Sequence, residues 1–126
     1  MRPATLAAVA RLTLSGDSFD RALAGFLDEF YARPTAEALS ETPPSLAFLD
    51  NDHGHVRDAY LAATAEELAN AYLFPVPRWA DGEDRKLHRP WFASSLAAVR
   101  AVLILESPPA FRSRNLSISE NALTRA

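Results

Sequence analysis

Apolar residues recur every three or four positions between residues 17 and 33, and this spacing predicts an amphipathic helix. The apolar positions are Phe19, Leu23, Phe26, Leu27 and Phe30. Asp17 or Ser18 can cap its start, because their side-chain oxygens accept backbone N–H groups of the first turn. Pro34 ends the helix, since a proline disfavours helical geometry in the preceding residue. Gly25 in its middle indicates a close helix crossing.

Residues 56–74 show the same helical period and predict a second amphipathic helix. Its apolar side comprises Tyr60, Leu61, Ala65, Leu68, Ala71 and Tyr72. Its polar side comprises Arg57, Asp58, Glu66, Glu67 and Asn70. Pro75 and Pro77 follow and end the helix, because proline cannot continue it.

The segment Leu96–Leu105 is apolar on nearly every side, and Arg100 is its only charged residue. Ser94 or Ser95 can cap it. A helix without a polar face is normally buried on all sides. We therefore expect this segment to be the central helix of the fold.

The other segments are less periodic. Residues 34–54 contain three prolines and predict a loop with at most one short helical turn. The linker that follows residue 74 carries two tryptophans, so we expect it to pack back onto the core. Near the N-terminus, residues 5–11 favour a short helix. The triplets 12–14 and 116–118 both alternate and leave open a small antiparallel ribbon between the two ends of the chain.

The C-terminal tail, residues 106–126, begins with Pro108 and Pro109 but still carries Phe111, Leu116 and Leu123. Such side chains are unfavourable in water, so we expect the tail to fold back onto the core with its arginines paired to acids at the edge. With 126 residues and 48% hydrophobic content, the chain can bury one core. We predict a single all-α domain over residues 1–126, a bundle of four to five helices with a long proline-containing loop and a packed C-terminal tail.

Composition narrows the setting of the protein. The chain has no cysteine, which excludes disulfides and thiolate chemistry and fits a reducing compartment. The first residues resemble the start of a signal peptide, but their apolar run ends at Arg11 and is too short for one. No segment approaches the length of about 20 apolar residues that crosses a bilayer. We expect a soluble, cytoplasmic protein.

Charge is divided unevenly along the chain. Residues 17–70 hold eleven acidic and three basic residues, whereas residues 71–126 hold eight basic and five acidic ones. This division predicts an acidic surface that repels nucleic acid and attracts a basic protein partner. The candidate partner-binding residues on this acidic face are Asp20, Asp28, Glu29, Asp58, Glu66 and Glu67. The alternative is that these acids only keep the helices soluble.

A second candidate surface lies in the tail, where Arg112, Arg114 and Asn115 are close in sequence. Arginine matches carboxylate and phosphate groups with two parallel hydrogen bonds. The competing interpretation, which we favour, is that these arginines tie the tail to Glu106 or to the acidic helices. Binding of nucleic acid would require a basic chain or aromatic residues between the arginines.

The only cluster with a metal-binding composition is formed by Asp50, Asp52, His53 and His55. The same stretch is typical of a loop that leads into a helix cap, with Gly54 turning the chain, and we favour that interpretation. Four scattered glycines exclude a phosphate-binding loop, and no serine lies in a nucleophile motif. We expect no catalytic residue, no metal and no cofactor.

The segments "FLDEFY", "DAYL", "RPWF" and "ESPPAFRSRNLSISENALTRA" occur in this order along residues 26–126. In this respect the chain resembles small helical bacterial proteins whose genes lie beside nucleotidyltransferase-like genes, in an arrangement similar to toxin–antitoxin pairs. The resemblance implies an antitoxin that binds and neutralises a nucleotidyltransferase-fold toxin, and it transfers no catalytic residue. A small helical enzyme or ligand-binding domain remains the alternative, with a pocket expected near His53, His55, His88 or Arg112.

Overall fold

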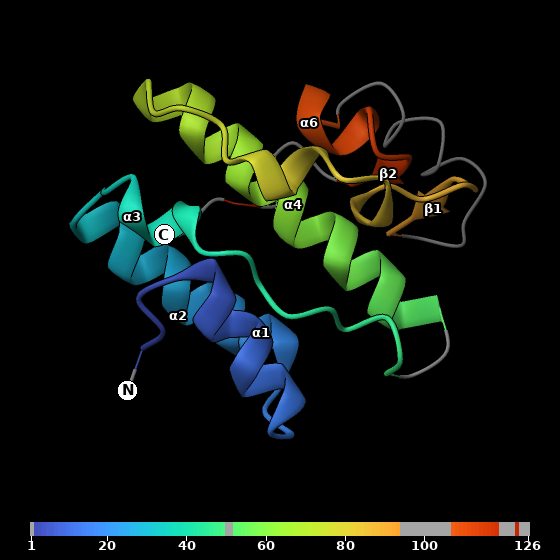
Figure 1. Ribbon diagram of the computed structural model, residues 1–126, viewed down its shortest axis with the longest axis horizontal. Helices are drawn as coiled ribbons and strands as arrows, with labels where there is room; N and C mark the ends of the chain where they lie inside the picture. The colour runs from blue at the N-terminus through green and yellow to red at the C-terminus, as the bar shows by residue number, and fades with distance from the viewer. Residues whose placement is uncertain (1, 50–51, 94–106, 119–122, 124–126) are drawn as a thin grey trace.

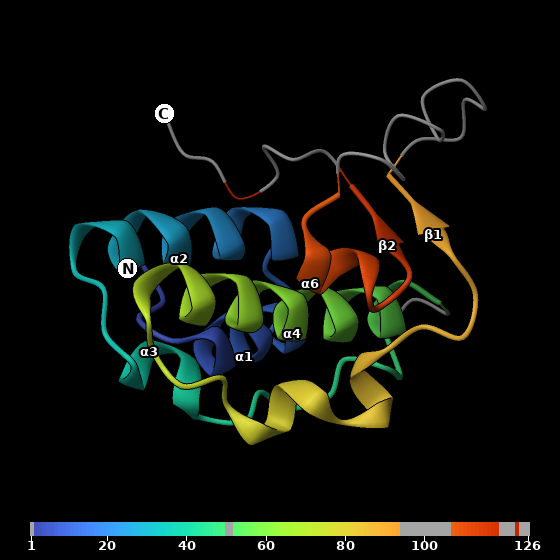
Figure 2. The same cartoon turned by 90° about the horizontal axis from the view of Figure 1, so that it is seen from above.

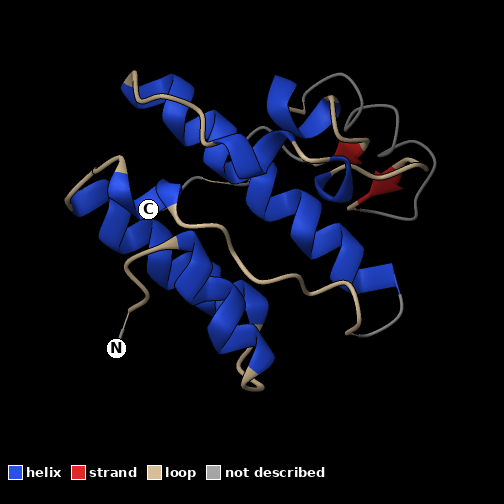
Figure 3. Ribbon diagram, viewed as in Figure 1, coloured by secondary structure: helices blue, strands red, loops and turns tan. Residues whose placement is uncertain are grey.

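The computed structural model describes residues 2–49, 52–93, 107–118 and 123, and these residues form a mostly helical fold (Figures 1 and 3). The α-helices are α1 (Leu6–Leu14), α2 (Phe19–Ala32), α3 (Glu37–Ser40), α4 (Asp52–Tyr72) and α6 (Pro109–Arg112). Two 3-10 helices, η1 (Arg78–Asp81) and η2 (Glu83–Arg85), and two short strands, β1 (Trp91–Phe92) and β2 (Leu116–Ser117), complete the described elements. The predicted all-α class is confirmed. The predicted central helix Leu96–Leu105 lies outside the described residues.

Helices α1 and α2 form an antiparallel pair joined by a short turn (Figure 1). The hydroxyl of Thr5 caps α1 by accepting from the Ala8 amide at 3.0 Å. Ser18 caps α2 and accepts from the Arg21 amide at 3.3 Å. Every apolar position predicted for α2 is buried, which confirms the stripe read from the sequence. Gly25, in contrast, faces Pro3 of the N-terminal segment and no second helix.

Helix α4 is the central element of the described part of the chain (Figure 2). Five consecutive residues, 61–65, are all buried, so its middle is covered on several sides. One face contributes Leu61, Ala62, Ala65, Leu68 and Ala69 to the core shared with α1 and α2. Another face contributes Val56, Ala59 and Ala63 to a second core formed with the C-terminal tail. Its small alanine side chains allow neighbouring segments to approach closely on both faces.

The described part of the C-terminal tail packs as predicted. Phe111, Leu116 and Ile118 are at most 2% exposed, and Leu123 lies against both cores. The Phe111 ring meets the Tyr60 ring edge-on, with 4.9 Å between centroids. Ser107 holds the two ends of the segment 107–118 together, because its Oγ accepts from the Ile118 amide at 2.8 Å and donates to the Ile118 carbonyl at 3.0 Å. The tail is therefore a folded part of the core.

The antiparallel ribbon that the two triplets left open is not formed. Residues 12–14 belong to α1, and Leu116 and Ser117 pair instead with Trp91 and Phe92 in a two-stranded parallel ladder. The side chain of Thr13 donates to the Val9 carbonyl at 2.9 Å, a contact that fits the helix. The linker does pack back: the indole of Trp79 donates to the Leu39 carbonyl at 2.9 Å.

Candidate partner-binding surface

The acids of α2 remain at the surface. The Asp20 side chain is exposed, and Asp28 and Glu29 are half-buried on the same helix. Arg21 and Arg33 are exposed on or beside α2, so the helix carries both signs of charge. The acidic character that the sequence predicted is therefore limited to part of this helix.

Asp58 is not part of an acidic face, because its side chain is buried with 1% of the residue exposed. Its two carboxylate oxygens accept from the Leu46 amide and the Ser45 hydroxyl, both at 2.8 Å. The guanidinium of Arg85, itself buried, lies 3.6 Å away. A carboxylate with this many donors can stay charged inside a protein. Asp58 thus anchors the proline-containing loop to α4, and its assignment to the partner-binding face is corrected.

Glu66 and Glu67 hold the tail. Glu66 forms a 2.8 Å ion pair with Arg114, and its side chain is 27% exposed. Glu67 accepts from the Ala110 amide at 3.1 Å, in the first turn of α6. Both carboxylates therefore already have partners within the chain. Their expected role as contacts for another protein stays a prediction.

The tail residues separate into one buried and two exposed side chains. Arg114 is 1% exposed and donates to the carbonyls of Ala110 and Ala80 as well as pairing with Glu66. The interpretation that a tail arginine ties this segment to an acidic helix is confirmed for Arg114. Arg112 and Asn115 are exposed, although Arg112 donates to the Ser107 carbonyl at 2.9 Å. Only these two tail candidates can meet another molecule.

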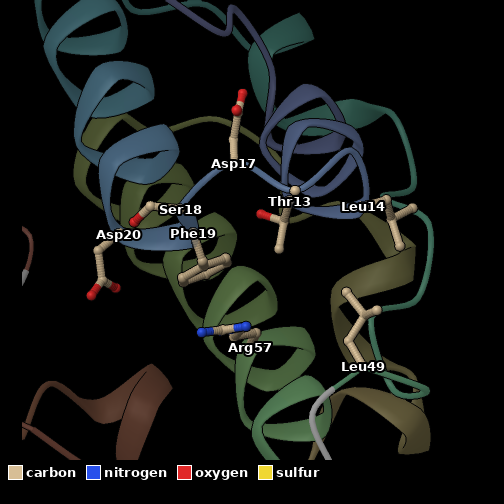
Figure 4. Close-up of a pocket in the computed structure, with 9 residues that line it drawn as sticks. Thr13, Leu14, Asp17, Ser18, Phe19, Asp20, Leu49 and Arg57 are labelled. Carbon is tan, nitrogen blue, oxygen red and sulfur yellow. The ribbon is translucent and has the colours of Figure 1, made fainter.

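Two hollows flank the turn between α1 and α2. The first, with a volume of about 340 Å³, has Phe19 and Arg57 on one side and Leu14 and Leu49 on the other (Figure 4). The Arg57 guanidinium lies over the Phe19 ring, 5.5 Å from its centroid. The second hollow, of about 450 Å³, lies on the other side of the turn and is lined by Arg2, Pro3, Leu12, Asp17, Ser18, Arg21, Ala22 and Gly25.

The carboxylates at the rim of the first hollow, Asp17 and Asp20, point away from its centre (Figure 4). The hollow therefore mixes apolar side chains with the hydroxyls of Thr13 and Ser18 and one guanidinium, without a converging set of catalytic groups. Neither hollow is lined by a histidine or by Arg112, where the ligand-binding alternative placed its pocket.

The histidines of the candidate metal cluster are both exposed at the start of α4. His53 and His55 are two positions apart on a helix and therefore point in different directions. Asp50 lies outside the described residues. Within the part of the chain that the structure describes, no group of three or more metal-ligating side chains comes together. Gly54, expected to turn a loop, is instead a helical residue of α4.

Tyr31 in the last turn of α2 and Tyr72 and Leu73 at the end of α4 are exposed, and we refer to these three residues as the Leu73 patch. The Tyr31 hydroxyl donates to the Leu123 carbonyl at 2.8 Å. The ends of the two helices are adjacent in both views (Figures 1 and 2). The Phe30 ring contacts both tyrosine rings, with centroids 6.0 and 5.1 Å away. Leu73 is 91% exposed. The sequence analysis missed this surface, although a Tyr-Leu-Phe run directly before a proline is a visible signal.

The chain matches no known protein family, no curated protein and no solved structure. Among the helices of the described residues, none has both the length and the apolar character needed to cross a lipid bilayer.

Tyr60 gives the fold a testable response to alkaline pH. Burial of its ring against Phe19 and Phe111, and secondly the negative charge of Asp20, raise the Tyr60 pKa to about 12. Between pH 10 and 12 the unfolded chain releases the phenol proton while the folded chain keeps it, so stability present below pH 10 is lost as pH rises. We expect this group to remove about 2 kcal/mol of stability over that range.

Urea unfolding at a series of pH values measures this loss, and Tyr60→Phe provides the control because it keeps the ring and removes the titrating hydroxyl. The variant should lose clearly less stability than the wild type between pH 10 and 12. Equal losses in the two proteins would show that Tyr60 does not cause the effect.

Proposed function

We propose that this chain is a protein-binding module of antitoxin type, which binds and neutralises a nucleotidyltransferase-fold toxin. The observation that carries the proposal is the Leu73 patch, an exposed group of large side chains. It lies on the same helix pair as Asp20, Asp28 and Glu29, the candidate acids of α2. Protein interfaces combine a central group of aromatic and apolar side chains with a polar rim. The order of the segments that resemble antitoxin-type proteins supports the choice of partner.

The acids of α2 suggest how neutralisation works. A nucleotidyltransferase-fold toxin needs a basic surface to hold nucleotide or RNA phosphates. Asp20 and Glu29 can compete for such a surface, because opposite charges steer the two proteins together and cover the phosphate-binding groups. The contact is then sensitive to ionic strength, since exposed charges are screened at high salt.

Co-expression of the chain with the product of the adjacent gene tests the proposal. We expect a complex that survives purification, together with restored growth of cells that express the neighbouring protein. The double variant Asp20→Asn, Glu29→Gln should bind about tenfold more weakly at low salt and show a smaller salt dependence. A matched control is Asp81→Asn, Glu83→Gln, which removes two exposed acids from η1 and η2.

The control variant should bind like the wild type. Failure of the wild-type chain to bind the neighbouring protein, with no rescue of growth, would contradict the proposed function. Equal weakening by both double variants would show that net charge alone, without the α2 site, governs the contact.

A further inference from the structure

Leu73 adopts a backbone conformation that is unfavourable for leucine. Its φ is +59°, in the left-handed region, where the Cβ of a non-glycine residue meets the neighbouring carbonyl oxygen. The residue directly follows α4, and the Phe74 amide donates to the Ala69 carbonyl at 2.8 Å, as in a Schellman motif. Glycine or asparagine usually occupies this position, because either tolerates the left-handed conformation.

Nothing in the described fold compensates for the leucine side chain. It is 91% exposed, so it contributes almost no buried apolar area to the folded chain. The cap itself needs only the backbone of residue 73, while the neighbouring Phe74 is the side chain that packs against the core. Leucine is therefore worse than glycine or asparagine for stability at this position. Residues that adopt an unfavourable backbone conformation are concentrated at functional sites.

We propose that Leu73 is the anchor residue by which the chain docks into an apolar pocket of its protein partner, with Tyr31 and Tyr72 packing around it. This inference rests on the proposed function and identifies its contact surface. The partner's pocket is bordered by basic side chains, because the chain carries a net charge of −3 and opposite charges steer two proteins together.

A second copy of the chain is a poorer occupant. A two-fold symmetric contact through the Leu73 patch would bring together two chains that each carry a net charge of −3. Like charges facing each other across an interface oppose association. A basic partner removes this repulsion and supplies the opposite charge.

The experiment uses two substitutions, Leu73→Gly and Leu73→Asn. Both relieve the unfavourable backbone conformation of residue 73 and remove the anchor side chain. Both are expected to raise the Tm of the free chain by about 2–4 °C, because the strained leucine is replaced by a residue that accepts a positive φ. Both are expected to weaken binding to the purified product of the adjacent gene at least tenfold, as loss of an interface anchor does. Variants that are more stable and yet bind more weakly separate a docking role from a structural one.

Phe48→Ser supplies the matched control, since Phe48 is 75% exposed and belongs to the loop before α4, outside the patch. It should leave the affinity unchanged. If the wild type binds the partner and the Leu73 variants bind equally well, the anchor inference is overturned while the proposed function stands. If the wild type forms no complex, both are overturned. If the Leu73 variants assemble differently from the wild type in the absence of partner, the occupant is a second copy.

Discussion

Replacing Gly54 by alanine is expected to destabilise the protein by about 3 kcal/mol or more, although the same change in most helices is stabilising. Gly54 lies in the first turns of α4, directly against the backbone of the loop before it. A Cβ added there would overlap the Leu46 carbonyl and lie 2.8 Å from the Leu49 carbonyl oxygen. These neighbours are backbone atoms, which cannot rotate away as a side chain can.

The loop cannot easily retreat from the added methyl group. The Leu46 amide donates to the buried carboxylate of Asp58 at 2.8 Å, and the Gly54 amide donates to the Leu49 carbonyl at 3.2 Å. Relief of the overlap would require at least one of these bonds to break, and a buried carboxylate that loses a donor is strongly unfavourable. The expected loss of stability therefore combines the steric overlap with the weakening of the hydrogen bonds to Asp58.

Gly25→Ala is the matched control, because Gly25 is also a helical glycine. There the added Cβ would meet the Pro3 ring at 3.4 Å and the Arg2 side chain at 3.8 Å, which are ordinary contact distances. Alanine should stabilise this position by up to about 1 kcal/mol through its higher helix propensity. Chemical denaturation of the two variants measures both changes. Equal or greater stability of the Gly54→Ala variant would refute the close approach of the loop to α4.

The opposite expectations for two glycines illustrate how far the sequence could predict this fold. Periodicity gave the ranges of α2 and α4 to within a few residues, because a long amphipathic stripe is a repeated signal. The prolines of residues 34–54 indicated a loop with at most one short helical turn, and that turn is α3. The alternating triplet 116–118 does contain a strand, Leu116–Ser117, but the triplet 12–14 is a helix end, since three alternating residues do not distinguish the two. The need for glycine at position 54 comes from the close approach of the loop before α4, and the path of that loop could not be predicted from the sequence.

The candidate site was harder to predict, because burial of a charged residue depends on segments far away in the sequence. Asp58 lies on the polar side of a helical wheel, yet its partners come from residues 45, 46 and 85. A wheel assumes one buried face, whereas α4 is covered on several sides. The Leu73 patch was missed for the converse reason: Tyr72 was placed on the apolar side of its helix, yet it is exposed. The burial of Asp58 and the exposure of the Leu73 patch both depend on which segments of the chain cover α4.

Replacing Arg114 by alanine is expected to destabilise the fold by about 3–5 kcal/mol. Arg114 is buried, and its guanidinium bridges three parts of the chain. Its Nη1 donates to the Ala110 carbonyl at 2.7 Å, and its Nη2 lies 2.9 Å from the Ala80 carbonyl oxygen and 2.8 Å from a Glu66 carboxylate oxygen. Removal of the side chain leaves the Ala80 carbonyl and a largely buried carboxylate without this donor, while the Ala110 carbonyl keeps the Ser113 hydroxyl at 3.1 Å. Buried groups that lose their donor are more unfavourable than a lost surface contact.

The two neighbouring arginines form a natural comparison, because they lie two residues apart in the tail. Arg112 is exposed and donates a hydrogen bond to the Ser107 carbonyl, so Arg112→Ala should lower the stability by only about 1 kcal/mol. Arg114→Lys should fall between the two alanine variants, since one ammonium keeps the charge next to Glu66 but cannot reproduce the planar fork that reaches both carbonyls. Urea unfolding at neutral pH ranks the three variants.

Glu66→Gln combined with each Arg114 variant completes a double-mutant cycle, which isolates the ion pair from the two carbonyl contacts. Among the described residues, the Nε of Arg114 has no acceptor, so part of the arginine's own burial is uncompensated. For that reason Arg114→Met with Glu66→Gln should recover some of the stability that Arg114→Ala loses, because it removes both charges and fills the space. If Arg114 served only partner binding, its substitution would lower the affinity for the partner and leave all of these unfolding curves unchanged.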